Sequence, residues 1–211
     1  MIRFTCIIDT SSYINLSHED SYAVGKTLLS LLSEKINIKF SSEVNREISR
    51  HHTALMPSST ERSAKVYRLS CKKIKTYKEY ESCLFDQVSQ RGDANIGEKH
   101  NLIVALDNYL NKRTKGLIFL TDDQKAMNGI LNEAVHSFPL YQIWNSFDVI
   151  LFLYIEHKLF DRDFAMNAIR DINAEIAKAN LPNTNHKKVE ERLKVFKTYM
   201  SRLERISKIL K

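Results

Sequence analysis

Short apolar runs alternate along the chain with segments whose apolar residues recur every three or four positions. The runs are typical of strands buried in a sheet, and the recurring spacing is typical of helices with one apolar face. Strands are predicted on this basis at residues 4–8 (FTCII), 36–40 (INIKF), 116–120 (GLIFL) and 138–143. Because strand and helix alternate through the first 145 residues, the pattern predicts an α/β fold on a parallel sheet.

Residues that cap helices mark where the helical segments are expected to begin. Ser17 and Asp20 have the spacing of a capping box, and Ser41 or Ser42 precedes a stretch with apolar residues at helical spacing. Further helices are predicted over residues 60–90 as a pair, after the RGDANIG break, from about 124 to 136, and after Ser146. From residue 161 onward we expect only helix.

An apolar seam runs through the last predicted helix at nearly heptad spacing. Its members are Val189, Leu193, Phe196, Met200, Leu203 and Leu210. Such a seam fits a helix that packs on its own domain, and it fits equally a helix that pairs with a second copy of the chain or with another protein. We therefore expect an α/β domain over residues 1–158 and a basic helical extension over residues 159–211, through which a homodimer could form.

The net charge of +7 is unevenly distributed along the chain. Residues 61–79 carry an excess of five positive charges and residues 180–211 an excess of six, which leaves −4 for the remainder. Two basic helical segments around an acidic body suit a polyanion such as RNA, although solvated helix faces give the same pattern. The candidate substrate-binding lysines in these segments are Lys72, Lys73, Lys187 and Lys188.

Composition argues against several other classes of protein. The three cysteines are an odd number without the spacing of metal ligands, so neither a disulfide framework nor a zinc site is indicated. The longest apolar run, residues 149–155, is too short to span a bilayer. The first residues lack the pattern of a signal peptide, so a cytoplasmic protein without a membrane partner is expected.

Acidic residues follow two of the predicted strands. Asp9 ends the first strand, and Asp122 and Asp123 come directly after the strand at 116–120. The carboxyl ends of parallel strands meet at one edge of a sheet, where α/β proteins form their sites, so we expect these carboxylates to lie close together. A single aspartate after a strand is more often a helix cap, so the joint pattern carries the expectation.

Two predicted helices bring further acids towards the same edge. Glu43 and Glu47 share one helix face, and Asp93 and Glu98 lie at the break and the first turn of the next helix. Carboxylates packed together repel one another unless a cation neutralises them. Mg²⁺ and Mn²⁺ prefer such oxygen ligands, and either could activate water and stabilise the charge on phosphate oxygens. The acids therefore predict a divalent-metal site.

Four segments within residues 1–145 carry these acids: IIDTSSYINL, SSEVNREISR, RGDANIGEKHNLIVAL and GLIFLTDDQKA. The first is a strand that ends in Asp followed by Thr. The acids of interest in the second and third are Glu47 and Glu98, and in the fourth the acid two positions after Thr121 is Asp123. In this order, the segments resemble the motifs of the PIN-domain family of metal-dependent nucleases.

The resemblance implies a three-layer α/β/α sandwich with a central parallel sheet and an acidic pocket that binds Mg²⁺ or Mn²⁺. It also implies hydrolysis of phosphodiester bonds, usually in RNA. Many small members of the family are toxins of toxin–antitoxin pairs, so an inhibitory protein antitoxin is an expected partner. The extension over residues 159–211 is longer than a minimal PIN domain needs.

The resemblance also assigns a catalytic quartet, which is Asp9, Glu47, Glu98 and Asp123. Asp9 and Asp123 would be the inner metal ligands. Glu47 and Glu98 would orient the waters around the metal or act as bases. Further candidate metal ligands are Asp93, Asp122 and Glu98 itself. The hydroxyl residues Thr10, Ser11 and Thr121 would bind the substrate, near the metal or phosphate.

Other classes of protein share parts of this pattern. A receiver domain needs an acid pair after the first strand, and a haloacid-dehalogenase-type phosphatase needs a second Asp at the position of Ser11. A structure-specific DNA nuclease usually carries more acids and a helical arch, a role that residues 61–79 could serve. A PIN-like fold without activity, kept as a nucleic-acid or protein-binding module, would have the same sequence features.

Overall fold

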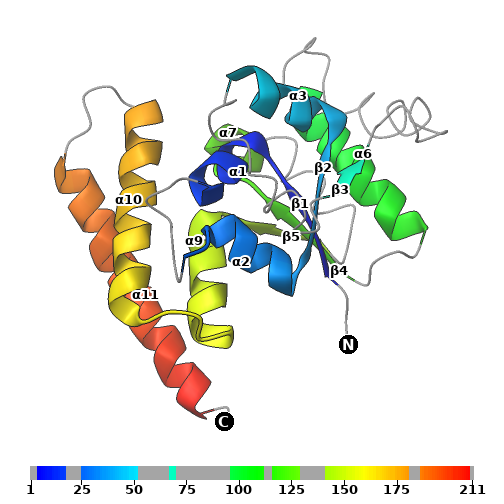
Figure 1. Ribbon diagram of the computed structural model, residues 1–211. Coiled ribbons are helices and arrows are strands. Elements are labelled where there is room, and N and C mark those ends of the chain that lie inside the picture. Colours follow the sequence, from blue (N-terminus) through cyan, green and yellow to red (C-terminus); the bar gives the residue numbers. More distant parts are fainter. Residues whose placement is uncertain are drawn as a thin grey trace.

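The computed structural model describes residues 4–17, 25–51, 67–69, 96–111, 116–128, 141–180 and 186–209. Within these ranges, five strands form one parallel sheet in the order β3-β2-β1-β4-β5 (Figure 1). The strands are β1 (Phe4–Ile8), β2 (Asn37–Ser41), β3 (Tyr67–Leu69), β4 (Gly116–Leu120) and β5 (Tyr141–Trp144). The expected α/β class and its parallel sheet are therefore confirmed.

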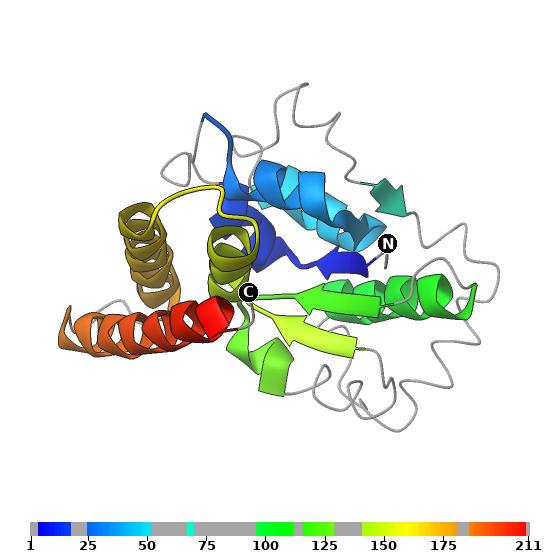
Figure 2. The ribbon, with the colours of Figure 1, turned by 90° about the horizontal axis from the view of Figure 1, so that it is seen from below.

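Helices cover both faces of the sheet (Figure 1, Figure 2). On one face α6 (Ile96–Leu110) packs against β1, β2 and β4, with α3 (Ser42–His51) beside it. On the other face lie α2 (Leu28–Lys35) and α9 (Ser146–Leu151), which continues as the short π-helix η4 (Phe152–Glu156). The remaining described helices are α1 (Thr10–Ser17), α7 (Gln124–Asn128), α10 (Arg162–Asn180) and α11 (His186–Ile209).

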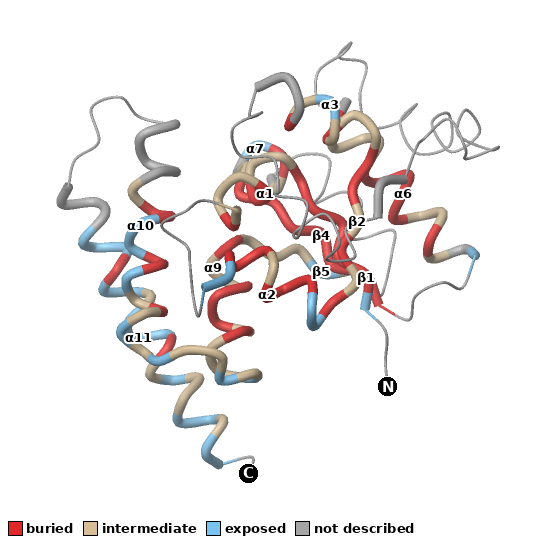
Figure 3. Tube along the Cα trace, in the orientation of Figure 1, coloured by how far each residue is buried: buried red, intermediate tan, exposed pale blue. Residues whose placement is uncertain are grey.

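Successive residues of the central strands point alternately to the two helical layers. Ile8 of β1 and Leu120 of β4 lie in a large apolar cluster together with residues of α1, α2 and α9. Ile7 and Phe119 alternate with them and are fully buried, so they face α6. Figure 3 shows the central strands buried along most of their length. Because both faces are covered, these strands appear in the sequence as continuous apolar runs.

Helices α10 and α11 pack against the α/β layers through the same apolar cluster. It includes Ile169 and Ile172 of α10 and Leu193 and Met200 of α11, so the core crosses the expected boundary between residues 158 and 159. Of the described members of the apolar seam, Leu193 and Met200 are buried by the chain's own residues, and Phe196 and Leu203 are partly buried against the same cluster. Among the described helices, none combines the length and the apolar content that a bilayer crossing requires.

Three helix starts differ from the prediction. A helix, α1, begins directly after β1, so Ser17 ends a helix instead of capping one. The next helix, α2, is capped by Thr27, whose hydroxyl accepts a hydrogen bond from the Ser30 N–H at 3.1 Å. Likewise α9 is capped by Asn145 and not by Ser146. Thr27 and Asn145 both have extended backbones, the conformation of an N-cap, which the spacing of polar residues does not reveal.

The segment 60–90, predicted to form two helices, contains the strand β3 where it is described. Its three residues pair in parallel with residues 39–41 of β2. A short edge strand stabilised by a partner distant in sequence leaves little local signal, which explains the wrong prediction. The last strand, β5, begins inside the expected run at 138–143, and α7 is the start of the helix expected over 124–136, whose remainder lies outside the described residues.

The carboxyl ends of β1 and β4 lie side by side at the centre of the sheet. The two strands pair in register up to Ile8 with Leu120, and the Asp9 N–H continues the ladder by donating to the Leu120 carbonyl at 2.9 Å. The strand order reverses here, because the chain leads from β1 to β2 on one side and from β4 to β5 on the other. Such a point leaves a crevice beyond the strand ends where α/β proteins bind ligands.

Asn101 of α6 joins the ends of β1 and β2. Its side chain is fully buried. The amide Nδ2 donates to the Ile8 carbonyl at 2.9 Å, and the amide oxygen accepts from the Ser41 N–H at 2.8 Å. One amide thus satisfies two backbone groups at this edge and positions α6 against them.

We expect Asn101→Leu to lower the free energy of unfolding by about 2 to 4 kcal/mol, because it leaves a buried carbonyl and a buried N–H without partners. Urea unfolding followed by circular dichroism measures the change. Asn111→Ala is the matched control, since Asn111 is exposed and, among the residues that the structure describes, its side chain bonds Asp107 at the end of the same helix. The control should stay within about 0.5 kcal/mol of the wild type. Equal effects of the two substitutions would contradict the role of Asn101.

Candidate active site

Asp9 is enclosed at the end of β1, with 5% of its surface exposed. Its Oδ1 accepts a hydrogen bond from the Thr10 N–H at 2.7 Å, and its Oδ2 accepts from the hydroxyls of Ser11 and Thr121, each at 2.9 Å. Burial nevertheless raises the pKa of Asp9, and the negative charge of Asp123 adds to the rise. The carboxylate is thus fixed in position by three donors, none of which is a cation.

Glu47 reaches the site from α3. The Thr10 hydroxyl donates to its Oε2 at 2.5 Å, so the first residue of α1 bonds both Asp9 and Glu47. On the other side, Gly97 of α6 lies so close that a β-carbon there would be 2.8 Å from Oε1 of Glu47. Gly97 therefore lets α6 approach the carboxylate without displacing it.

Glu98 follows Gly97 in the first turn of α6 and interacts with the other acids. Burial raises the pKa of Glu98 to about 7, and the charge of Asp9 is the next largest cause. The charges of Glu47 and Asp123 raise it further. Interactions between charges weaken with distance, so these effects on the pKa of Glu98 indicate that the four expected acids lie close together. They come from the end of β1, from α3, from α6 and from the connection after β4.

The adjacent acids Asp122 and Asp123 have different surroundings. The Asp122 carboxylate accepts hydrogen bonds from the Asn15 amide at 2.7 Å and from the N–H and hydroxyl of Ser146 at 2.8 and 2.5 Å. Asp122 therefore joins α1 and α9 to the end of β4. The Asp123 carboxylate caps α7 through a backbone N–H at 2.7 Å, and its charge raises the pKa of Glu98. The charge of Asp123 raises the pKa values of Asp9 and Glu98, whereas the charge of Asp122 raises the pKa of Asp148.

The three hydroxyl residues expected near a metal or phosphate all lie at the site. The hydroxyls of Thr10, Ser11 and Thr121 each donate to one of the acids. Ser11 also accepts from the Asp122 N–H, and Thr121 accepts from the Asp123 N–H, both at 3.1 Å. In this structure, these hydroxyls hold the acids and the loop after β4 in place.

The remaining candidates are not part of this cluster as described. Those that lie outside the described residues are Asp93, Lys72 and Lys73 and, as side chains, Lys187 and Lys188. Glu43, which shares a helix face with Glu47, forms an ion pair with Arg46 one turn along α3. The substrate-binding role of the four lysines stays a prediction.

Four residues outside the set of candidates hold the site together: Asn15, Gly97, Asn101 and Ser146. An asparagine within the apolar face of a predicted helix is the signal that could have identified Asn101, because a buried amide needs partners. Asn15 and Ser146 have no such local signal. Both bond Asp122, which follows β4, whereas Asn15 is distant from it in sequence and Ser146 follows β5.

The oxygen donors of this cluster are of the kind that a hard divalent cation prefers. Over the described ranges, no three His, Cys, Asp or Glu side chains are placed as a ready-made set of ligands. Mg²⁺ commonly binds through one or two carboxylates and keeps several waters, so two of these acids are sufficient. The raised pKa values of Asp9 and Glu98 fit a site in which a cation offsets the repulsion between carboxylates.

No family model matches the chain, and no curated protein or solved structure matches it either. The resemblance to PIN domains therefore rests on the four sequence motifs. What the site does has to be inferred from its residues and their geometry.

We expect the metal-free protein to lose stability as the pH rises from about 5 to about 8. The pKa of Glu98 is about 7 in the folded protein, against an ordinary value of 4.5, so between these values the folded state holds a proton that the unfolded state has lost. That proton favours folding, and its loss as the pH passes the folded pKa costs on the order of 1 to 3 kcal/mol.

Urea unfolding in EDTA at a series of pH values measures this decline. Glu98→Gln should flatten it, because glutamine does not titrate. Glu156→Gln is the matched control, since Glu156 is an exposed acid of η4 with the same chemical change. A Glu98→Gln protein that declines as steeply as the wild type would show that another group is responsible.

Proposed function

We propose that this chain is a metal-dependent endoribonuclease with a PIN-like fold. The observation that carries the proposal is the gathering of four coupled acids where the strand order reverses: Asp9, Glu47, Glu98 and Asp123. Placing buried like charges close together destabilises the fold, and such an arrangement is typical of functional sites. The order of the four sequence motifs supports the same assignment.

In this proposal, Asp9 and Asp123 would hold the cation, because Asp9 follows β1 and Asp123 follows β4, and these strands are neighbours at the centre of the sheet. Mg²⁺ or Mn²⁺ bound there would act as a Lewis acid, which would activate water and offset the charge on the phosphate oxygens. Glu98, which lies in the first turn of α6 close to the other three acids, would accept the proton of the attacking water. Glu47, held by the Thr10 hydroxyl, orients that water.

RNA is the proposed substrate, from the family resemblance and from the excess of cationic side chains. Among the side chains of helix α11 that the structure describes, six exposed ones are cationic: Arg192, Lys194, Lys197, Arg202, Arg205 and Lys208. Exposed cations attract the phosphate backbone without regard to its sequence. The proposal implies a cytoplasmic, toxin-like nuclease with an inhibitory antitoxin as its protein partner.

Cleavage of a labelled RNA pool is expected with Mn²⁺ or Mg²⁺ and not with EDTA. Asp9→Asn and Asp123→Asn should each lower the rate by at least about 10²-fold, because each removes a charge that holds the cation. Asp163→Asn is the matched control, since Asp163 is exposed in the first turn of α10. It should retain the wild-type rate, as measured by gel electrophoresis.

Circular dichroism and urea unfolding show whether each variant remains folded, so that loss of cleavage is assigned to the site. Matched RNA and DNA strands distinguish the two substrates. Folded wild-type protein, free of a bound inhibitor, that cuts neither strand with either metal would refute the nuclease proposal. Such a result would favour a PIN-like module that binds without catalysis, and cutting of DNA alone would replace RNA as the substrate.

Gly97→Ala tests the position of Glu47 without removing any acid. The new β-carbon would meet the flexible end of the Glu47 side chain, so the fold should persist while the carboxylate is displaced. Helix propensity alone favours alanine by up to about 1 kcal/mol. Cleavage should nevertheless fall by roughly 10- to 10²-fold, the cost of a misplaced catalytic group. A stable Gly97→Ala protein with wild-type cleavage would remove Glu47 from the mechanism.

A further inference from the structure

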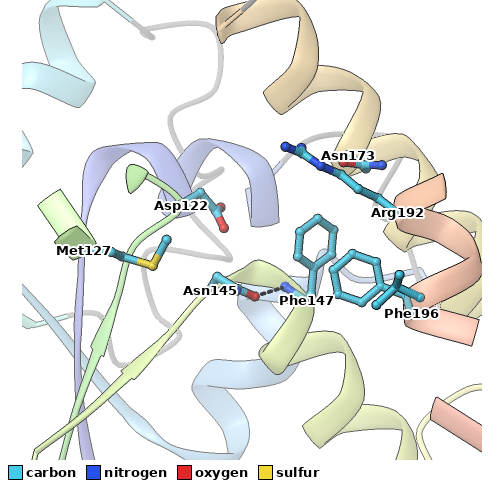
Figure 4. A pocket seen from close by; sticks show the side chains of 8 residues that line it. Asp122, Met127, Asn145, Phe147, Asn173, Arg192 and Phe196 are labelled. Carbon is cyan, nitrogen blue, oxygen red and sulfur yellow. Dashed lines mark hydrogen bonds between the residues drawn. The ribbon is translucent and has the colours of Figure 1, made fainter. Parts of the chain in front are cut away.

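A cavity of about 270 Å³ lies between the sheet edge and the two C-terminal helices (Figure 4). Its walls come from Asp122 after β4, from Asn145 and Phe147 at the start of α9, and from residues of α10 and α11. Drug-sized ligands occupy about 300 to 1,000 Å³, so this cavity suits a single small ring system.

Two phenylalanines form an aromatic wall of the cavity. The ring centroids of Phe147 and Phe196 are 4.4 Å apart, with the rings tilted by 40°. Figure 4 shows both rings beside the cavity. Each side chain is only half-buried, so part of its ring surface stays accessible. Nucleobases of any identity stack on accessible aromatic rings.

Amide groups beside the aromatic wall can pair with the edge of a base. The Asn145 oxygen accepts from the N–H groups of Phe147 and Asp148 at 2.9 and 3.1 Å, which fixes the orientation of the amide. Its two N–H donors make no hydrogen bond to any described residue. Asn173 of α10, with 1% of its surface exposed, contributes a second amide. Amides of this kind recognise the donors and acceptors of unpaired bases.

Arg192 supplies a cation where the cavity borders α11. Its side chain is exposed and lines the cavity, and Figure 4 shows it beside Asn173. A guanidinium presents a fork of donors that matches phosphate oxygens. The cavity therefore combines the groups that recognise a base with one that recognises its phosphate.

The cavity adjoins the acidic site through the chain itself. Asp122 lines the cavity, and the next residue, Asp123, belongs to the acid cluster. A trans peptide joins them, so their Cα atoms are about 3.8 Å apart. A nucleotide that occupied the cavity would lie beside Asp122, one residue before Asp123 of the acid cluster.

We propose that this cavity binds one nucleobase of single-stranded RNA, adjacent to the phosphate that the acidic site cuts. Phe147 and Phe196 stack on the base, Asn145 donates to its edge, and Arg192 contacts a flanking phosphate. The inference rests on the proposed function, which supplies the substrate. It makes the protein selective for unpaired strands, because a base enters the cavity only when it is free of a duplex.

Binding without cleavage tests this proposal. The full chain is titrated in EDTA into a labelled, short single-stranded RNA, and fluorescence anisotropy measures the dissociation constant. In a set of otherwise identical RNAs, one nucleotide at a time lacks its base. We expect one position at which the missing base weakens binding by at least about 5-fold, the effect of losing one stacked base.

Two substitutions test whether that base sits in the cavity. Val195→Met extends a side chain that lines the cavity and is 68% exposed, so it fills the space without disturbing the core. Arg192→Gln removes the cation. The matched controls are Ile209→Met on the same helix, at a residue that is 81% exposed, and Arg170→Gln, at an exposed arginine of α10.

Val195→Met should weaken binding of the intact RNA and leave binding of the RNA without that base unchanged. Arg192→Gln should weaken binding of both, and the two controls should bind as the wild type does. The proposal is overturned if all the RNAs bind equally well. It is also overturned if the missing base weakens binding to the Val195→Met protein as much as binding to the wild type. If a missing base weakens binding but RNA is not cleaved with Mg²⁺ or Mn²⁺, the nuclease proposal alone is refuted. If RNA is cleaved but no missing base weakens binding, the proposal of a nucleobase site in the cavity alone is refuted.

Discussion

The burial of like charges at the centre of the sheet edge is the constraint on which the rest of the structure depends. Asp9 lies beyond the end of β1, beside β4, and three donors hold its carboxylate although burial raises its pKa. The other three acids reach it from α3, from α6 and from the connection after β4. Each of these elements therefore has to be placed accurately against the two central strands, and most of the buried polar contacts serve that purpose.

Neutral groups hold these elements in place. The Asn101 amide links α6 to the ends of β1 and β2, and hydroxyls link the start of α1 to the acids. Asp122, itself an acid, accepts three hydrogen bonds from Asn15 and Ser146. Because amides and hydroxyls position a carboxylate without cancelling its charge, the cluster stays negative while it is held rigidly.

The central strands and the acids after them could be predicted, since a strand covered on both faces is a continuous apolar run and Asp9 directly follows one. The N-caps Thr27 and Asn145 could not be predicted from the sequence. An N-cap is the last residue with an extended backbone before a helix, and the order of polar residues does not show which residue that is. The edge strand β3 is three residues long and is held by pairing with β2, which local patterns do not show. The choice between Asp122 and Asp123 depends on partners from α1 and α9, and these become neighbours only in the folded chain.

The apolar cluster that runs beneath the acids has a consequence for modularity. Ile8 and Leu120, directly before the site, belong to the same cluster as Ile169 of α10 and Met200 of α11. A chain shortened to residues 1–158 would keep every described acid of the site and yet uncover the apolar surface on which those helices rest. The helical extension is thus part of the hydrophobic core of the fold. Residues 1–158 alone would not be a self-contained domain that could carry the acidic site into another protein.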